Sequence, residues 1–236
     1  MRPLPLRVTS EFLGTLFLVA AVVGSGIMGE RLAAGNVAMA LLANTVATGA
    51  ALVALILTFG PISGAHLNPA VTIVDAWESG IPWAEAPYYV TAQIAGGIGG
   101  AIVANFMFGV PAISLSRHIR TGPAQWLSEF VATFGLLSVI WGCSRTRSSA
   151  VPFAVAAYIT AAYWFTASTS FANPAVTIAR SLSDTFAGIR LADVPWFVCA
   201  QFLGAFAATM LFRWLVPDLQ IRSKEILLAH DTGESR

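Results

Sequence analysis

The stretch Asn68-Pro69-Ala70-Val71-Thr72-Ile73 recurs as Asn173-Pro174-Ala175-Val176-Thr177-Ile178, 105 residues later. Six consecutive identities are too long a match to come from composition alone. Asn is a strong helix N-cap because its side-chain oxygen accepts a backbone N–H that has no partner inside the helix. Pro suits the next position, where no N–H is needed. Each copy therefore predicts the start of a helix, and each helix N-terminus carries roughly half a positive charge.

The composition is that of an integral membrane protein. The chain has 236 residues, of which 56% are hydrophobic and 11% are charged, whereas about a quarter of the residues in a soluble domain are charged. The net charge of +1 offers no basic face, so we expect no nucleic-acid partner. One capped motif alone would favour an ordinary pair of helices. Two copies in matching contexts of a membrane protein favour a functional site.

The hydropathy pattern predicts six membrane-spanning helices and two shorter ones. Stretches long enough to cross ~30 Å of hydrocarbon lie at about 8–29, 37–59, 84–108, 124–143, 150–168 and 194–216. Two shorter apolar stretches, about 68–78 and 173–184, begin at the repeated motifs. Non-helical backbone at this depth is tolerated only where it lines a cavity or is buried in protein, so we interpret both stretches as re-entrant half-helices.

Further repetition indicates that the chain consists of two equivalent halves. Ser10-Glu11-Phe12 recurs as Ser128-Glu129-Phe130, and Ala92-Gln93 recurs as Ala200-Gln201. Each half then holds three spans and one half-helix. Because three is odd, the halves insert with opposite orientation, which predicts an all-α membrane protein with an inverted 3+3 repeat and a site near the bilayer midplane.

We expect a single domain over residues 1–236. It divides into a half-repeat at 1–110, a connecting loop at 111–123, a half-repeat at 124–217 and a polar cytoplasmic tail at 218–236. The start of the chain resembles a secretory signal, but its apolar run carries Glu11 and is repeated around Glu129, which indicates a retained first helix. With the N-terminus inside, eight Lys and Arg residues lie inside and five outside. This bias places both termini in the cytoplasm.

Polar residues within the apolar stretches have two interpretations each. Glu11 and Glu129 could form a proton relay, since membrane carboxylates are costly and usually functional or paired. Their symmetry favours a structural role, in which they accept hydrogen bonds from the re-entrant loops. His66 could be a pH gate, but we favour a loop-support role, in which it forms hydrogen bonds that hold the loop carbonyls toward the pore. Cys143 and Cys199 are interpreted as small core residues rather than a disulfide.

Paired Asn-Pro-Ala motifs at this separation resemble those of the major intrinsic protein family, the aquaporins and aquaglyceroporins. The resemblance covers about residues 8–217. It implies a channel in the inner or plasma membrane, with the N-terminus inside and with Glu11 and Glu129 supporting the loops. It also implies a homotetramer in which each protomer has its own pore. The chain shows no nucleophile–base pair, phosphate loop or metal-ligand spacing, so we expect neither an enzyme nor a cofactor.

The motifs suggest how such a pore would conduct. The amides of Asn68 and Asn173 would donate hydrogen bonds to a passing oxygen, and the two positive helix ends would repel cations and oppose proton transfer. Carbonyl groups at 63–67 and 168–172 would accept hydrogen bonds along the path. With an otherwise apolar wall, this favours downhill passage of small neutral molecules.

The family's outer constriction is expected to be formed by four positions counted from the motifs. Val176 stands where an arginine is typical, Ala161 where water-selective members carry histidine, and Thr48 where an aromatic ring is usual; Ser170 is the fourth. The positions of Thr48 and Ala161 assume an alignment without gaps. These small residues predict a mouth that is wider and less polar than usual.

A wide mouth fits glycerol and other polyols, urea and metalloid hydroxides such as arsenous acid, and methylated arsenicals would also fit. The loss of the filter arginine resembles a subgroup of bacterial aquaglyceroporins linked to arsenic resistance. A water-selective channel, a gas- or ammonia-conducting channel and a proton-coupled secondary transporter remain alternatives. An adhesive protein with an occluded pore is a further one, which the small filter residues disfavour.

Overall fold

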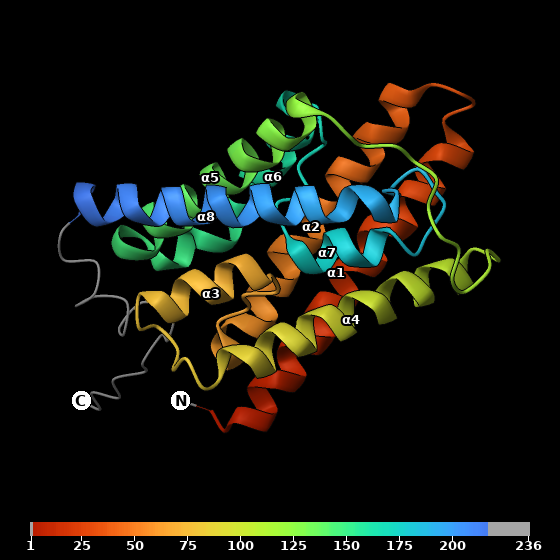
Figure 1. The fold of residues 1–236 in the computed structure, drawn as a ribbon. Coiled ribbons are helices and arrows are strands. Elements are labelled where there is room, and N and C mark those ends of the chain that lie inside the picture. The colour runs from red at the N-terminus through yellow and green to blue at the C-terminus, as the bar shows by residue number, and fades with distance from the viewer. Residues whose placement is uncertain (1, 217–236) are drawn as a thin grey trace.

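The computed structural model describes residues 2–216, and the tail predicted at 218–236 lies outside the described residues. All regular structure in the described part is helical (Figure 1). Six helices are long and apolar enough to cross a membrane. They are α1 (Leu4–Leu32), α2 (Val37–Ser63), α4 (Ala86–Met107), α5 (Pro123–Thr146), α6 (Val151–Phe165) and α8 (Val194–Leu215). The last two of these spans, α6 and α8, include the short 3-10 turns that precede them, Ser148–Ala150 and Leu191–Asp193.

Two short helices begin at the repeated motifs. They are α3 (Pro69–Trp77) and α7 (Pro174–Arg180), each with the motif Asn as its N-cap. The expected class is confirmed: an all-α protein with six membrane-length helices and two half-helices. The second half-helix ends at Arg180 rather than at the predicted residue 184. The chain turns there, and its carbonyls at Ser181 and Leu182 accept hydrogen bonds from the loop that connects the halves.

Helix starts follow from the sequence. Every long helix except α2 has a proline in its first two positions, where its fixed φ suits the helix and its missing N–H costs nothing. In α2 the N-cap is Asn36, whose side chain accepts a hydrogen bond from the backbone N–H of Met39 at 3.2 Å.

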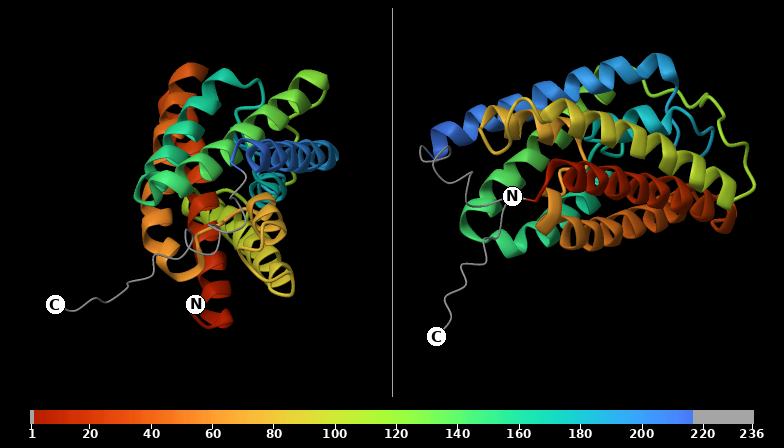
Figure 2. Two further views of the ribbon diagram at one scale, coloured as in Figure 1. Left: turned by 90° about the vertical axis from the view of Figure 1, so that its left-hand side faces the viewer. Right: turned by 90° about the horizontal axis from the view of Figure 1, so that it is seen from below.

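The packing repeats between the halves. In the first half α1 packs against α2 and α4, and in the second half α5 packs against α6 and α8. Helix α2 contacts α6, and each half-helix contacts both α4 and α8. The start of α1 and the end of α8 lie toward the same end of the molecule (Figure 2).

Glycines allow the close helix pairs. A Cβ at Gly96 of α4 would collide with the carbonyl oxygen of Phe12 in α1, and a Cβ at Gly204 of α8 would collide with the carbonyl oxygen of Phe130 in α5. Both carbonyls belong to the residue that follows a repeated glutamate. Small residues at such crossings let helix backbones approach closely in a membrane, and this places Glu11 and Glu129 at equivalent depths.

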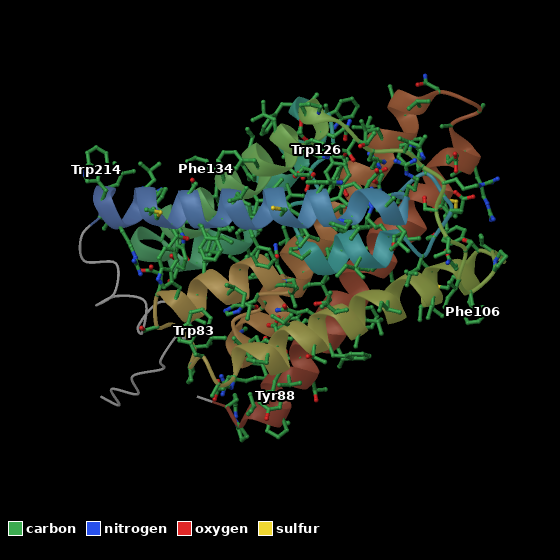
Figure 3. All side chains as sticks on the ribbon, in the orientation of Figure 1. Trp83, Tyr88, Phe106, Trp126, Phe134 and Trp214 are labelled. Atoms are coloured by element: carbon green, nitrogen blue, oxygen red, sulfur yellow. The ribbon has the colours of Figure 1, made fainter. Side chains whose placement is uncertain are left out.

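The outer surface is apolar. Large side chains such as Trp83, Phe106 and Trp214 are more than half exposed and lie near helix ends (Figure 3), as aromatic residues do at membrane interfaces. Cys143 and Cys199 are both free thiols. The expected core position is wrong for Cys199, which is exposed on α8, because a lipid-facing helix surface is as apolar as a core.

Candidate functional site

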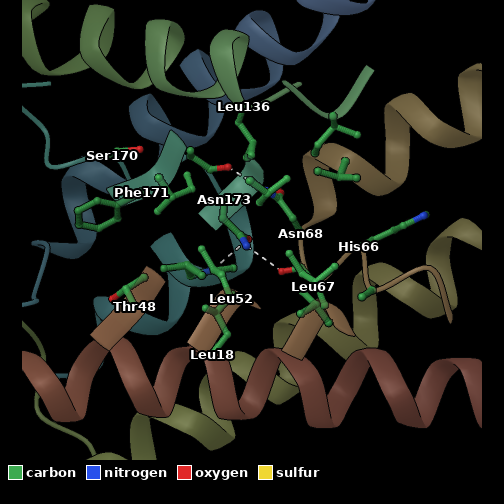
Figure 4. Close-up of a pocket in the computed structure, with 18 of the residues that line it drawn as sticks. Leu18, Thr48, Leu52, His66, Leu67, Asn68, Leu136, Ser170, Phe171 and Asn173 are labelled. Carbon is green, nitrogen blue, oxygen red and sulfur yellow. Dashed lines mark hydrogen bonds between the residues drawn. The ribbon is translucent and has the colours of Figure 1, made fainter. Parts of the chain in front are cut away.

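A cavity of about 100 Å³ lies at the centre of the molecule, bounded by α1, α2, α3, α5, α6, α7 and the two loops that lead to the half-helices. In Figure 4 the motif residues Asn68 and Asn173 occupy the middle, with Phe171 on one side and His66 on the other. We call these two sides the Phe171 end and the His66 end. Most of the wall is apolar and includes Leu18, Val22, Leu52, Ile56, Leu136, Ile140, Val155 and Ile159.

The two motif asparagines are locked by the same set of bonds. Asn68 Oδ1 accepts from the Ala70 N–H at 2.9 Å, and Asn173 Oδ1 accepts from the Ala175 N–H at 3.0 Å. Each Nδ2 then donates across the symmetry axis to the opposite loop: Asn68 to the carbonyl of Ala172 at 2.8 Å, and Asn173 to the carbonyl of Leu67 at 2.7 Å. These two carbonyls belong to the stretches expected to accept hydrogen bonds along the path, and each has a second lone pair beside the one that holds the amide. Their role toward a solute stays a prediction.

This arrangement leaves one donor per asparagine for a passing molecule. An amide nitrogen carries two N–H groups, and the cross-bond uses one of them. The helix cap prevents the amide from turning its oxygen toward the lumen. Because α3 and α7 meet here with their N-termini, their positive ends add to a field that favours oxygen acceptors and disfavours cations.

The loops before the motifs share an unusual backbone. Ala65 and Leu67 have φ of 47° and 49°, and the residues 105 positions later, Ser170 and Ala172, have φ of 52° and 47°. Left-handed conformations at residues other than glycine cost of order 1–3 kcal/mol each and persist only where the surroundings impose them. Both loops therefore need an anchor.

The two buried glutamates are these anchors. Glu11 accepts from the backbone N–H groups of His66 at 3.0 Å and Leu67 at 2.7 Å. Glu129 accepts from the N–H groups of Phe171 and Ala172, both at 2.9 Å. The side-chain amides of Gln93 and Gln201 donate to the two glutamates at 2.7 Å and 2.6 Å, and Glu11 also accepts from the Ser63 hydroxyl at 2.6 Å. This geometry is the structural alternative that the sequence favoured over a proton relay.

His66 lines the cavity and is held by its neighbours. Its Nδ1 lies 3.1 Å from Thr72 Oγ1, which also accepts from the Gln93 amide at 2.9 Å. Its Nε2 lies 3.5 Å from Asp75 Oδ2. Only the Nδ1 side of the ring is thus held by a hydrogen-bonding distance to half-helix α3, and Nε2 has no hydrogen-bond partner among the described residues. That His66 holds the loop carbonyls toward the pore stays a prediction.

Three of the four expected filter residues lie together at the Phe171 end. Thr48, Ser170 and Val176 line the cavity and are buried. Ala161 does not: it lies on the exposed face of α6. Tyr163 takes the place on the cavity wall and its hydroxyl lies 3.2 Å from Thr48 Oγ1. The residue of α6 that faces the cavity here thus lies two positions after the one that the ungapped count gives.

Two large residues that the sequence reasoning missed line the same end. Phe171 is the counterpart of His66, and Arg180 is the last residue of α7. Together with Tyr163 they correct the expectation of a mouth made only of small, weakly polar groups. The missed signal was helical spacing, since residue 180 follows Val176 by four positions and shares its helix face.

The family model described as major intrinsic protein matches residues 5–152 and 141–234. Aquaglyceroporin AqpS of Rhizobium meliloti is 56% identical over 210 residues, covering 89% of this chain and 90% of the relative. Aquaporin AqpM of Methanothermobacter thermautotrophicus is 31% identical and covers 90% and 98%.

The fold is also known from a crystal structure. The aquaglyceroporin of Plasmodium falciparum superposes with a TM-score of 0.71 at 19% identity, over 93% of this chain and all of that one. Such proteins are membrane channels rather than enzymes. On the family match and the relatives together, this chain belongs to the major intrinsic protein family.

Proposed function

We propose that the protein is a passive channel for small uncharged solutes that carry oxygen, namely glycerol and other polyols, urea and metalloid hydroxides, together with water. The observation that supports this most is the pair of fixed amides from Asn68 and Asn173, each with one free N–H, in a cavity with a largely apolar wall. Such a wall binds solutes weakly, and weak binding allows fast passage.

The state of the carboxylates argues against a coupled transporter. Coupling to protons needs a carboxylate that is free to load and release a proton near the midplane. Both oxygens of Glu11 and both oxygens of Glu129 accept hydrogen bonds from loop N–H groups or glutamine amides. Both carboxylates are thus used to hold the loops and are not free to load and release a proton.

Among the solutes, we propose arsenous acid and methylated arsenicals as the specific class. Arsenous acid is neutral at pH 7 and presents three hydroxyl groups, as glycerol does. Val176 lines the cavity where the family typically has an arginine, which leaves room for such a molecule. A relative that is 56% identical is named an aquaglyceroporin.

A channel selective for water, or one that conducts gases or ammonia, is the second candidate. Tyr163, Phe171 and Arg180 at the Phe171 end favour it, since large side chains narrow a mouth and pore diameter sets the largest solute. The two candidates differ in whether glycerol, urea and arsenous acid pass.

The test is solute flux into proteoliposomes, followed by light scattering, for water, glycerol, urea and arsenous acid. Wild type is compared with Val176→Arg, which puts a long side chain into the cavity, and with Val176→Ile as the matched apolar control. Arg at this position is expected to lower the flux of the three larger solutes by about tenfold or more while water still passes. Undiminished glycerol and arsenous acid flux would contradict the filter role, and water flux alone in wild type would favour the second candidate.

We also propose a homotetramer in the inner or plasma membrane with both termini cytoplasmic. An even number of spans puts both termini on one side, and the apolar outer surface offers faces for neighbouring protomers. Mass measurement in lipid nanodiscs tests the assembly. Protease access to a tag placed after residue 236, in sealed right-side-out vesicles, tests the orientation.

A further inference from the structure

Arg180 lies one helical turn beyond Val176 on the same face of α7. It is 2% exposed, yet it lines the central cavity. Residues four apart on a helix are neighbours on one surface, so a cation on residue 180 faces the same lumen as residue 176, farther from the paired asparagines. Residue 176, where the family typically has an arginine, is a valine here, and the next residue on the same helix face, Arg180, is an arginine.

The guanidinium is held in place with most of its donors unused. Its Cζ lies 3.4 Å from the centroid of the Phe171 ring, and its Nε donates to the carbonyl of Ala187. Within residues 2–216, no acceptor lies at hydrogen-bond distance from either Nη. A guanidinium carries five N–H donors in a rigid fork, and here a single bond and a stacking contact fix its plane. Four N–H groups remain for a ligand.

A second arginine supports the first. Arg120 in the connecting loop places its Cζ 5.1 Å from the centroid of the same ring and donates to the carbonyls of Gly188 at 2.8 Å and Ser168 at 3.2 Å. It is not among the described residues that line the cavity. Figure 4 shows Phe171, the ring that both cations contact, beside Ser170 at that end of the cavity.

These two charges lack the carboxylate partners that other arginines have. In the described part of the chain, four arginines form ion pairs: Arg7 with Glu85, Arg117 with Asp184, Arg190 with Asp193 and Arg213 with Glu78. Neither Arg120 nor Arg180 forms one there. The buried carboxylate of Glu129 attracts both arginines electrostatically but forms no ion pair with either in the described part of the chain. Two cations against this one carboxylate leave a net positive potential at the Phe171 end.

A nearby loop residue responds to this potential. The pKa of His118 is lowered from its ordinary value, first by partial desolvation and then by the charges of Arg120 and Arg180. A cation held without a partner in a buried position is costly. The single hydrogen bond to the carbonyl of Ala187 does not offset the free energy of burying a charged guanidinium. A structural role for Arg180 alone therefore does not account for its burial.

We propose that Arg180 is the cationic contact of this pore, moved one turn outward from residue 176, and that Arg120 reinforces its field. Its free Nη groups donate to the oxygen of a passing uncharged solute, and its charge excludes monovalent cations. The solute-binding part rests on the proposed function, whereas the exclusion of cations is measured separately.

The experiment compares wild type, Arg180→Gln and Arg180→Lys in proteoliposomes, with Arg117→Gln as the control. Arg117 is 90% exposed and pairs with Asp184, so its loss removes the same formal charge from the surface. Sodium permeability is read from the diffusion potential across the vesicle membrane, and glycerol flux is read from light scattering. Arg180→Gln is expected to raise sodium permeability by roughly tenfold or more. Arg180→Lys keeps the exclusion of sodium but changes glycerol flux, because it lacks the stacked fork.

Wild-type sodium permeability and glycerol flux in Arg180→Gln would overturn the proposal. An equal rise in Arg117→Gln would overturn it as well, because a surface charge would then suffice. If Arg180→Gln does not assemble, Arg120→Gln takes its place. Raised sodium permeability in Arg120→Gln supports the proposal. Wild-type sodium permeability in Arg120→Gln, together with wild-type glycerol flux in Arg180→Lys, overturns it. Failure of wild type to pass glycerol would overturn the proposed function alone, since sodium exclusion by Arg180 is still measured.

Discussion

The two ends of the central cavity are built on the same backbone but carry different chemistry. Residues 64–68 and 169–173 share their left-handed positions, their asparagine cap and their glutamate anchor. At one end the loop presents His66, with Asp75 in the half-helix beside it. At the other end the equivalent positions, 105 residues later, hold Phe171 and Arg180. The two halves share the asparagines and glutamate anchors that form the centre of the pore, and they differ in the side chains at its two ends.

The shared part is expected to give the largest effect when it is broken. Glu11→Ala and Glu129→Ala each remove the acceptor of two loop N–H groups and one glutamine amide, and Glu11→Ala also removes the acceptor of the Ser63 hydroxyl. Each buried donor left unsatisfied costs about 1–3 kcal/mol. Both variants should lose several degrees of thermal stability in detergent, to a similar extent.

The matched controls are Glu11→Gln and Glu129→Gln, which keep one acceptor oxygen and should lose less. A large loss in one half with none in the other would contradict the equivalence of the two anchors.

An intermediate effect is expected at the contact between Thr48 and Tyr163. Their hydroxyl oxygens lie 3.2 Å apart, and a net hydrogen bond contributes about 0.5–1.5 kcal/mol. Tyr163→Phe and Thr48→Val should each lower stability by about that amount, and the double variant should lose no more than either one. A double-mutant cycle on thermal unfolding measures this, and strictly additive losses would show that the two hydroxyls do not interact.

A smaller effect on thermal stability is expected when the pH is lowered, at the ion pair between Asp184, which follows α7, and Arg117 of the connecting loop. The backbone N–H and then the side chain of Arg117 hold the pKa of Asp184 below its ordinary value. A lowered pKa in the folded state stabilises the protein above the ordinary aspartate pKa, about 4, and this stabilisation is lost as the pH falls through the folded-state pKa. Below pH 4 the thermal midpoint of wild type should approach that of Asp184→Asn. A constant difference between them at all pH values would contradict this.

The smallest effect is expected from Asp75→Asn, which sharpens the comparison with Arg180. Asp75 occupies the equivalent position in the first half, but it is buried beside His66 and is not among the described residues that line the cavity. Glycerol flux and sodium permeability should stay within about twofold of wild type. A change as large as that expected for Arg180→Gln would show that both half-helices set selectivity.

The sequence predicted what depends on local pattern and repetition. Hydropathy located six spans, and the Asn-Pro pairs located the starts of α3 and α7 to the residue. The symmetry of Glu11 and Glu129 indicated that both support the loops. Each of these features depends only on residue type and on spacing or repetition along the sequence.

The filter was predicted less well because it is formed by residues from different helices. Val176 and Ser170 lie close to the second motif in the sequence and were located correctly at the cavity. Ala161 lies on another helix, so its place depended on the path of the chain between α6 and the motif. Arg180 was not predicted because the family's arginine is expected at residue 176, whereas here an arginine follows one turn later on the same face of α7.

The central claim is that uncharged solutes pass the paired asparagines down their gradient, and glycerol flux into proteoliposomes tests it most directly. The account predicts that glycerol enters wild-type vesicles faster than protein-free vesicles, with a weaker temperature dependence and at a rate that a proton gradient does not change. Flux equal to that of protein-free vesicles, or flux that follows the proton gradient, would contradict it.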